Sequence, residues 1–157
     1  MSSVDVAHFK EVLGHYATGL VIVTADTEQG PAGFTCQTFG SLSLEPPMVV
    51  FAANVEGNSW GKVRQGAAVG INILNAEQES LARQFATSGV DKFEGTAWKK
   101  GPSGAPLLEA ALGHIEGHIA EVSRHGDHEL VVLEVSYVHA RSGHPLIYFR
   151  GGFSELA

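Results

Sequence analysis

The residues best able to contact a ligand lie in one segment that combines hydroxyl, amide and thiol side chains with two glycines. Gly33 and Gly40 occur in this segment, and glycine lets the backbone approach a ligand closely. Short hydroxyls and backbone N–H groups in such a stretch suit a phosphate and the polar edge of a heteroaromatic ring. A strand rich in serine and threonine, interrupted by a bulge, fits the same composition equally well. The candidate cofactor-binding residues are Thr35, Cys36, Gln37, Thr38, Ser41 and Ser43.

Two further segments could bind an anion beside an aromatic ring. Asn58 and Ser59 stand at a possible helix start, where backbone N–H groups lack partners within the helix. Lys92 could pair with an anion, and Phe93 could cover a ring. Taken alone, each of these residues is more typical of an ordinary surface.

Asp127 and His128 are the best candidates for an acid–base pair or a substrate contact. A carboxylate beside an imidazole can raise the pKa of the imidazole or fix its orientation. An exposed turn is the alternative interpretation, because Gly-Asp sequences favour turns for backbone reasons. These two residues alone favour the turn.

A metal site is not expected at His114, Glu116 and His118, although all three point to one face if they lie on a strand. Spaced two apart, these side chains would spread over about 13 Å and could not close around one ion. A polar, solvent-facing side of a strand is the favoured interpretation. Cys36 is the only cysteine, which excludes an intrachain disulfide and a thiolate zinc cluster. We expect it to be a buried structural residue.

The elements that must position these residues are mostly strands. Apolar residues that recur at helical spacing between Val6 and Tyr16 predict a first helix, with Ser2 and Asp5 as its start signal and Gly14 and Gly19 bracketing its end. A second helix is expected after Asn75, which could cap it with Gln78 three residues later. Segment 88–104 is expected to be an irregular loop and 124–128 a hairpin turn. The expected strands cover 20–25, 33–44 with a break near Gly40, 48–53, 67–74, 114–122, 129–139 and 146–149.

Six or seven strands and two helices without regular alternation favour an antiparallel barrel with attached helices, mainly β with some α. The 157 residues suit a single domain, 1–157. A formal charge of −7 argues against a general nucleic-acid binder. The start of the chain lacks the pattern of a signal peptide, and no apolar run is long enough to cross a membrane, so a cytoplasmic location is expected. No P-loop, dinucleotide-binding glycine motif or nucleophile elbow is present.

In their order and spacing, these segments resemble the flavin reductase-like family of FMN-binding split barrels. This family includes the small reductase components of two-component flavin-dependent monooxygenases. The similarity extends from about Phe9 to Leu156. The stretches that carry it are Thr18–Thr24, Gly33–Pro47, Asn72–Leu74, Gln78 with Leu81–Ala82 and Phe85–Ala86, Asp91–Phe93, Gly126–His128 and Pro145–Tyr148.

The resemblance implies an NAD(P)H:flavin oxidoreductase of the split-barrel fold. It implies a homodimer with FMN or FAD near the subunit interface, NADH or NADPH as hydride donor, and a separate oxygenase component as recipient of the reduced flavin. Other interpretations are a pyridoxamine-phosphate oxidase-like protein and a non-catalytic flavin- or haem-binding module. The Asp-His turn and the Asp91–Phe93 segment favour the reductase.

The resemblance also assigns roles to individual residues. Thr35–Thr38 and Ser41–Ser43 would contact the flavin, with Asn58 and Ser59 at its phosphate. His128 would lie near the nicotinamide. The family often has serines where Cys36 and Gln37 stand, and a cysteine where Gly117 stands. The remaining expected contacts are Lys92 and Phe93 beside the flavin, and Tyr148, Arg150 and Gly151 along the same cleft.

Overall fold

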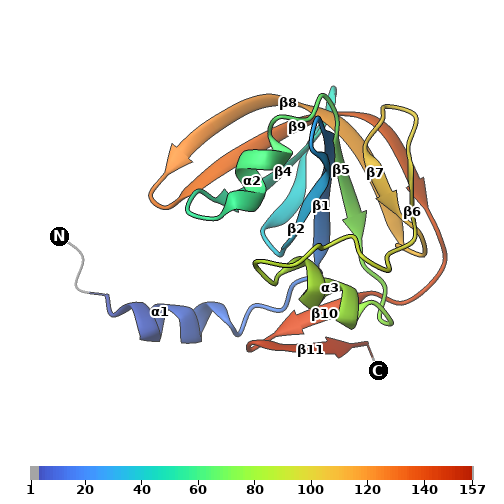
Figure 1. Cartoon of the computed structure of the whole chain (residues 1–157). Helices are drawn as coiled ribbons and strands as arrows, with labels where there is room; N and C mark the ends of the chain where they lie inside the picture. The colour runs from blue at the N-terminus through green and yellow to red at the C-terminus, as the bar shows by residue number, and fades with distance from the viewer. Residues whose placement is uncertain (1–3, 157) are drawn as a thin grey trace.

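The computed structural model describes residues 4–156, and its centre is one curved antiparallel sheet (Figure 1). Each strand pairs antiparallel with its neighbours. The β-branched and apolar runs of the sequence form these strands because both faces of much of the sheet are buried. The strand order is β2 (Gly30–Cys36), β1 (Val21–Thr27), β5 (Val69–Ile73), β8 (Gly113–His125), β9 (His128–Ala140), β4 (Pro47–Asn54) and β3 (Phe39–Leu44).

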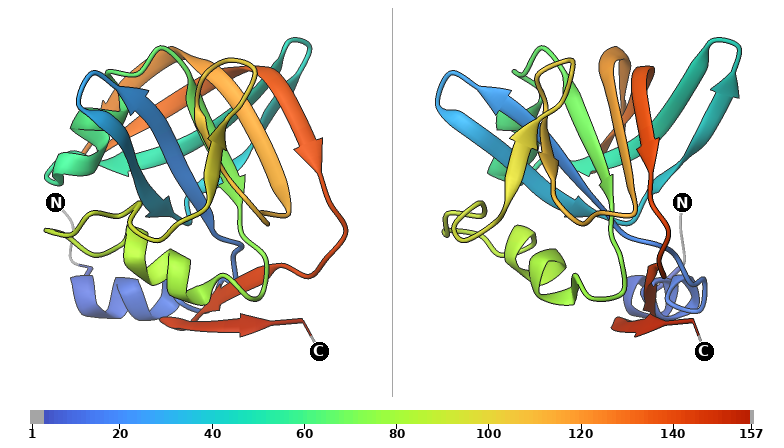
Figure 2. Two further views of the ribbon diagram at one scale, coloured as in Figure 1. Left: turned by 45° about the vertical axis from the view of Figure 1, so that its right-hand side comes forward. Right: turned by 90° about the vertical axis from the view of Figure 1, so that its right-hand side faces the viewer.

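The sheet curls until its two ends approach each other (Figure 2). The Ala52 N–H on β4 donates to the Thr38 carbonyl just after β2 at 3.1 Å, and the Cys36 thiol donates to the Ala52 carbonyl at 3.5 Å. Within the part of the chain that the structure describes, β3, the outermost strand, pairs with β4 alone. The expected split barrel, mainly β with few helices, is therefore confirmed.

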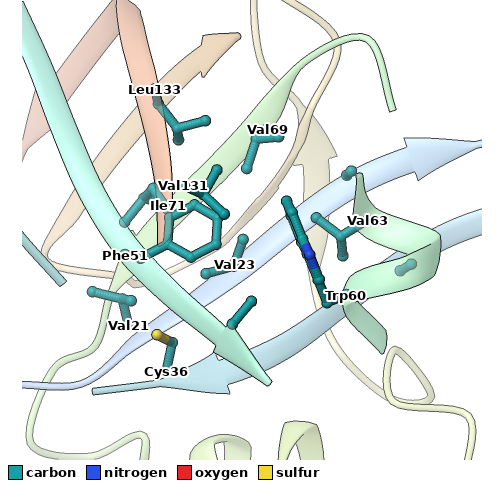
Figure 3. Packing of buried hydrophobic residues seen from close by; sticks show 13 residues of the cluster. Val21, Val23, Cys36, Phe51, Trp60, Val63, Val69, Ile71, Val131 and Leu133 are labelled. Atoms are coloured by element: carbon teal, nitrogen blue, oxygen red, sulfur yellow. The ribbon is translucent and has the colours of Figure 1, made fainter. Parts of the chain in front are cut away.

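The barrel interior is filled by apolar side chains from the strands and from one short helix. This helix, α2 (Asn58–Val63), directs Trp60 and Val63 into the interior, where Figure 3 shows them beside Val23. The Trp60 ring meets the ring of Phe51 edge-to-face, with centroids 5.7 Å apart. Packing into the barrel thus fixes α2 and the residues at its start.

A second cluster lies outside the barrel, between β1 and the helix α3 (Glu79–Phe85). Phe85 of this helix packs edge-to-face on Phe93, which packs in turn on Trp98. Two small antiparallel pairs complete the chain: β6 (Trp98–Lys100) with β7 (Pro106–Leu108), and β10 (Leu146–Phe149) with β11 (Gly152–Glu155).

The first helix, α1 (Val6–Leu13), extends away from the barrel in Figure 1. Asp5 caps it by accepting from the His8 N–H at 3.2 Å, as expected, whereas Ser2 lies outside the described residues. Gly14 and Gly19 were expected to bracket the end of the helix, and the helix ends at Leu13 with Gly14 as its C-cap, so Tyr16 lies beyond it. Within residues 4–156, no helix combines the length and apolar character needed to cross a bilayer. The side chains of the stripe are all exposed: Val6, Phe9, Val12, Leu13 and Tyr16.

Several boundaries differ from the sequence prediction. The break between β2 and β3 falls at residues 37–38 and not at Gly40, because Thr38 turns the chain to reach Ala52. Asn75 does bond to Gln78 through its backbone N–H, but the regular helix begins only at Glu79. The predicted loop 88–104 contains β6, and β11 was not predicted; both are short strands that pair only with a local neighbour.

The prediction of a solvent-facing polar side at His114 and Glu116 is wrong. Both are buried, because the segment containing β6 and β7 covers this face of β8. The His114 imidazole bonds to the Leu108 carbonyl at 2.6 Å. Glu116 accepts from the backbone N–H groups of Ser103 and Ala105, so its carboxylate holds that covering segment.

Candidate functional site

Two clefts lie side by side along the outer face of β2. The first, the Lys92 cleft, has a volume of about 460 Å³, and the second, the Tyr148 cleft, has about 600 Å³. Gly33 lines the first and Thr35 the second, two positions further along the same strand. Because side chains alternate along a strand, both positions face the same side. The two clefts therefore form neighbouring parts of one surface.

The Lys92 cleft gathers the polar residues at the start of α2 beside the loop after α3. The Lys92 ammonium donates to the Ser59 hydroxyl at 2.7 Å and to the Gly33 carbonyl at 3.3 Å. Asn58 and Phe93 also line the cleft. The structure thus brings together all four residues predicted from these two separate segments.

The Lys92 cleft carries two cations. Burial, and then repulsion from Lys62, lower the pKa of Lys92 below the usual lysine range. The charged ammonium of Lys92 is therefore less stable here than in water, and a bound anion would stabilise it by offsetting the desolvation and the repulsion from Lys62. Asp91 also lines the cleft, but its carboxylate accepts from the Phe93 N–H and it is exposed. A phosphate is a suitable ligand for such a site.

The Tyr148 cleft lies between β2, α3 and the β10–β11 hairpin. The Tyr148 ring packs on the ring of Phe153 with centroids 5.5 Å apart. The Arg83 guanidinium stacks over Phe153 at 4.5 Å and pairs with Glu79 at 3.0 Å. Flat groups thus form this wall, which suits a planar ring system. The predicted residues among its lining are Thr35, Gln37, Tyr148 and Gly151.

The free edge of β2 supplies backbone groups between the clefts. The Gly33 carbonyl accepts from Lys92, so it points away from β1. Since residues two apart in an edge strand project their backbone groups from the same side, the Thr35 N–H points the same way. The Thr35 hydroxyl donates to the Ala82 carbonyl of α3 at 2.6 Å, which holds the helix against the strand. A backbone donor is therefore available where the two clefts join.

Cys36 and Thr38 take a different position from their neighbours. Cys36 faces the barrel interior, and burial raises the pKa of its thiol, so the side chain is the structural residue that we expected and not a ligand contact. The Thr38 hydroxyl donates to the Ala52 carbonyl at 3.0 Å. It lines a third cleft, shared with Gln37, near the end of α1. Both side chains close the barrel.

His128 lies at the first position of β9, next to the tight turn that ends β8. Its Nδ1 lies 2.8 Å from the Asp127 carboxylate, and this hydrogen bond, followed by the charge of the imidazole, lowers the pKa of Asp127. An ionised carboxylate accepts, so Nδ1 carries the proton and Nε2 is left free to face a ligand. The structure therefore shows the oriented Asp-His pair, on a tip that neighbours α2.

Besides Cys36 and Thr38, four predicted residues do not line either cleft within this chain. They are His128, Ser41, Ser43 and Arg150. The two serines lie on β3, at the opposite edge of the sheet from β2. Arg150 occupies the β10–β11 turn with a positive φ of 52°.

Two lining cations, Lys62 and Arg83, were missed in the sequence. Lys62 lies four positions after Asn58, a spacing that puts both on one face of a helix. That spacing could have revealed it once the short helix was predicted. Arg83 had no such signal, because its partner Phe153 belongs to a strand that was not predicted.

The surface that joins the clefts suits an elongated ligand with one anionic end and one flat aromatic end. From Gly33 to Gln37 the strand rises about 13 Å. Lys62 and Lys92 lie at one end and the aromatic wall with Arg83 at the other, with a backbone N–H between them. A flavin mononucleotide has this arrangement of charge and ring.

Comparison with known proteins gives a consistent result. The family described as "Flavin reductase like domain" matches residues 13–157. The reductase subunit HsaB of a flavin-dependent monooxygenase from Rhodococcus jostii is 35% identical over 155 residues, covering 98% of this chain and 80% of that protein. The FMN reductase (NADH) SmoA of Agrobacterium fabrum is 31% identical over 149 residues, covering 95% of this chain and 85% of that protein.

A solved structure shares the fold closely. The NADH:FAD oxidoreductase SgcE6 of Streptomyces globisporus, in complex with NAD and FAD fragments, superposes with a TM-score of 0.91 at 30% identity. The match covers 98% of this chain and 93% of that one. With its split barrel and paired clefts, this chain belongs to the flavin reductase-like domain family.

Proposed function

We propose that this chain is an NAD(P)H-dependent flavin reductase that reduces FMN or FAD and supplies the reduced flavin to a separate monooxygenase component. The observation that carries the proposal is the Lys62–Lys92 cation pair in a cleft that adjoins the aromatic-walled Tyr148 cleft. The membership of the family and the names of the relatives support it. The proposal treats residues 1–157 as one domain.

The Lys92 cleft would hold the flavin phosphate. Lys92 would exchange its bond to the Ser59 hydroxyl for a bond to the phosphate, in which the donor and the acceptor both carry charge. Ser59 and Asn58 would then donate to the remaining phosphate oxygens. Lys62 would balance the second negative charge from the same helix.

The outer face of β2 would hold the ring. The backbone N–H of Thr35 and the amide of Gln37 would face its polar edge, where negative charge develops on reduction. Tyr148 and Phe153 would exclude water from its apolar end. When bound there, a flavin would supply the redox chemistry, the acceptance of a hydride from NAD(P)H.

His128 would orient the nicotinamide nucleotide. Asp127 fixes the ring through Nδ1, which leaves Nε2 to contact a polar group of the nucleotide. Hydride transfer requires the reacting atoms at about 3–3.5 Å, so an orienting contact affects rate and affinity without any proton transfer. His128→Ala should raise the KM for NADH more than it changes flavin affinity.

We also propose that the protein acts as a homodimer in the cytoplasm. The exposed apolar stripe of α1, together with Leu42 and Leu44 of β3, is unusual for a chain that functions alone. A second copy would also bring Ser41 and Ser43 to a cleft that they do not reach within their own chain. Light scattering on the purified protein tests the dimer directly.

The decisive experiment is a kinetic comparison of flavin and nicotinamide pairs. Purified protein is titrated with FMN, FAD and riboflavin, and the oxidation of NADH and NADPH is then followed with each flavin. We expect micromolar or tighter binding of at least one phosphorylated flavin and turnover with it. Binding without turnover would indicate a flavin-binding module, and no binding of any flavin would reject the proposal.

A further inference from the structure

One carboxylate joins the tip that carries His128 to the helix that lines the Lys92 cleft. A single oxygen of Glu129 accepts from the Trp60 indole N–H at 2.7 Å and from the Arg64 guanidinium at 2.9 Å. Glu129 directly follows His128 on β9, and Trp60 directly follows Ser59 on α2. The carboxylate therefore connects the immediate neighbours of two residues with proposed ligand roles.

The connection has the features of a rigid link. Trp60 is buried in the barrel core, so the donor cannot move without disturbing the packing against Phe51. Arg64 stacks over the Trp60 ring at 5.4 Å, which fixes the second donor against the first. The Glu129 side chain is only 19% exposed, so water competes weakly for its oxygens.

A backbone bond completes the same connection. The Val55 N–H donates to the Asp127 carbonyl at 3.1 Å, just before α2 begins. The tip is thus held at Asp127 through the backbone and at Glu129 through the side chain. His128 lies between these two points in the chain.

We infer that Glu129 is a positioning residue that fixes His128 relative to Asn58 and Ser59, and so sets the placement of the nicotinamide nucleotide against the flavin. This inference rests on the proposed function. Glu129 itself touches neither ligand. It acts through Trp60 and Arg64 on one side and through the backbone of β9 on the other.

The test is a double-mutant cycle with His128. Glu129→Ala removes both hydrogen bonds, whereas Glu129→Gln keeps an oxygen that can accept from Trp60. The matched control is Glu134→Ala, which removes an exposed carboxylate from the same strand. Each variant is made alone and together with His128→Ala, and KM for NADH, kcat and the Kd for FMN are measured.

We expect Glu129→Ala to raise the KM for NADH about threefold to tenfold, as the loss of a charge-assisted bond allows. Glu129→Gln and Glu134→Ala should stay within about twofold of the parent protein. In the His128→Ala background, Glu129→Ala should add less than about twofold, because the residue that it positions is already gone. A full additional effect in that background would overturn the inference.

A second measurement separates positioning from simple loss of structure. The chain has two tryptophans, so Trp98→Phe leaves Trp60 as the only indole emitter. In that background, Glu129→Ala should shift Trp60 emission while the melting temperature stays within a few degrees. A shifted emission with unchanged KM for NADH would refute a positioning role. If His128→Ala alone leaves the KM for NADH unchanged, the proposed function of His128 is wrong, and the inference about Glu129 fails with it. The His128→Ala variant alone shows this outcome, so it is distinguishable from a failure of the Glu129 inference itself.

Discussion

Replacing Lys92 by methionine should weaken FMN binding without affecting riboflavin. Lys92→Met keeps an unbranched apolar side chain of similar length and removes only the ammonium, which donates to Ser59 and Gly33. Riboflavin lacks the phosphate, so its affinity measures the ring and ribityl contacts without the interaction between the phosphate and Lys92. The ratio of the two dissociation constants is therefore the quantity of interest.

The magnitude follows from the surroundings of the ammonium. A hydrogen bond to a charged group contributes about 1.5–3 kcal/mol, which corresponds to roughly tenfold to 150-fold in Kd. Lys92 is only partly buried, and Lys62 remains in the cleft, so screening favours the lower part of that range. We expect the Kd for FMN to rise about tenfold and the Kd for riboflavin to change less than about twofold.

Flavin fluorescence titration at low ionic strength measures both constants. Lys99→Met is the control, since Lys99 is an exposed lysine on β6 that lines neither cleft. Thermal unfolding should show no loss of stability in Lys92→Met, because burial and Lys62 already disfavour the charged form in the folded protein. Equal weakening of FMN and riboflavin, or an unchanged Kd for FMN, would refute the placement of the phosphate.

Three further predictions follow from the same structure. The pKa of Lys92 lies below the usual lysine value of about 10.4, so Lys92 should lose its charge, and FMN its affinity advantage over riboflavin, as the pH rises through this lowered pKa. Titrations of both flavins across this pH range should show the decline in the parent protein and no decline in Lys92→Met. Glu116→Ala should lower the free energy of unfolding by about 3 kcal/mol in urea titrations, because the buried N–H of Ala105 and the N–H of Ser103 lose their acceptor; a loss under about 1 kcal/mol would contradict this. Gly33→Ala should cost about 1–3 kcal/mol and weaken flavin binding, because its Cβ would lie 2.8 Å from the Val23 carbonyl and 3.1 Å from the Phe85 ring; unchanged stability and affinity would show that the strand and α3 can separate freely.

The sheet could be predicted from the sequence because its strands carry strong local patterns. The β-branched run at residues 20–25 and the long alternating segments of β8 and β9 specify strands whatever their partners. The short strands β6 and β11 carry too few residues for a pattern. They are strands only because a neighbouring segment pairs with them, and this information is absent from a local window.

The burial of Glu116 could not be predicted for a related reason. Alternation correctly placed His114, Glu116 and His118 on one face, but the nature of that face depends on what covers it. A segment 11–13 residues earlier lies over β8 and provides backbone donors to the carboxylate. A charged residue in a strand is usually exposed, and only tertiary contacts reverse that expectation here.

The candidate site was predicted in part. The Lys92 cleft assembles Asn58, Ser59, Lys92 and Phe93 from two segments, as the resemblance implied. Strand alternation separates Cys36 from Thr35, since adjacent residues face opposite sides of β2. The place of Ser41 and Ser43 stays a prediction, because it depends on a second copy of the chain.

The two faces of β2 have different roles, and this difference restricts which insertions and deletions the strand can tolerate in evolution. Ala32, Phe34 and Cys36 fill the barrel, whereas Gly33, Thr35 and Gln37 line the clefts. Inserting or deleting one residue would exchange these two sets, sending a phenylalanine to the ligand and a glutamine to the core. A substitution at one position therefore affects either the core or the clefts, whereas a change of length in β2 would lower both the stability of the barrel and the affinity for the ligand.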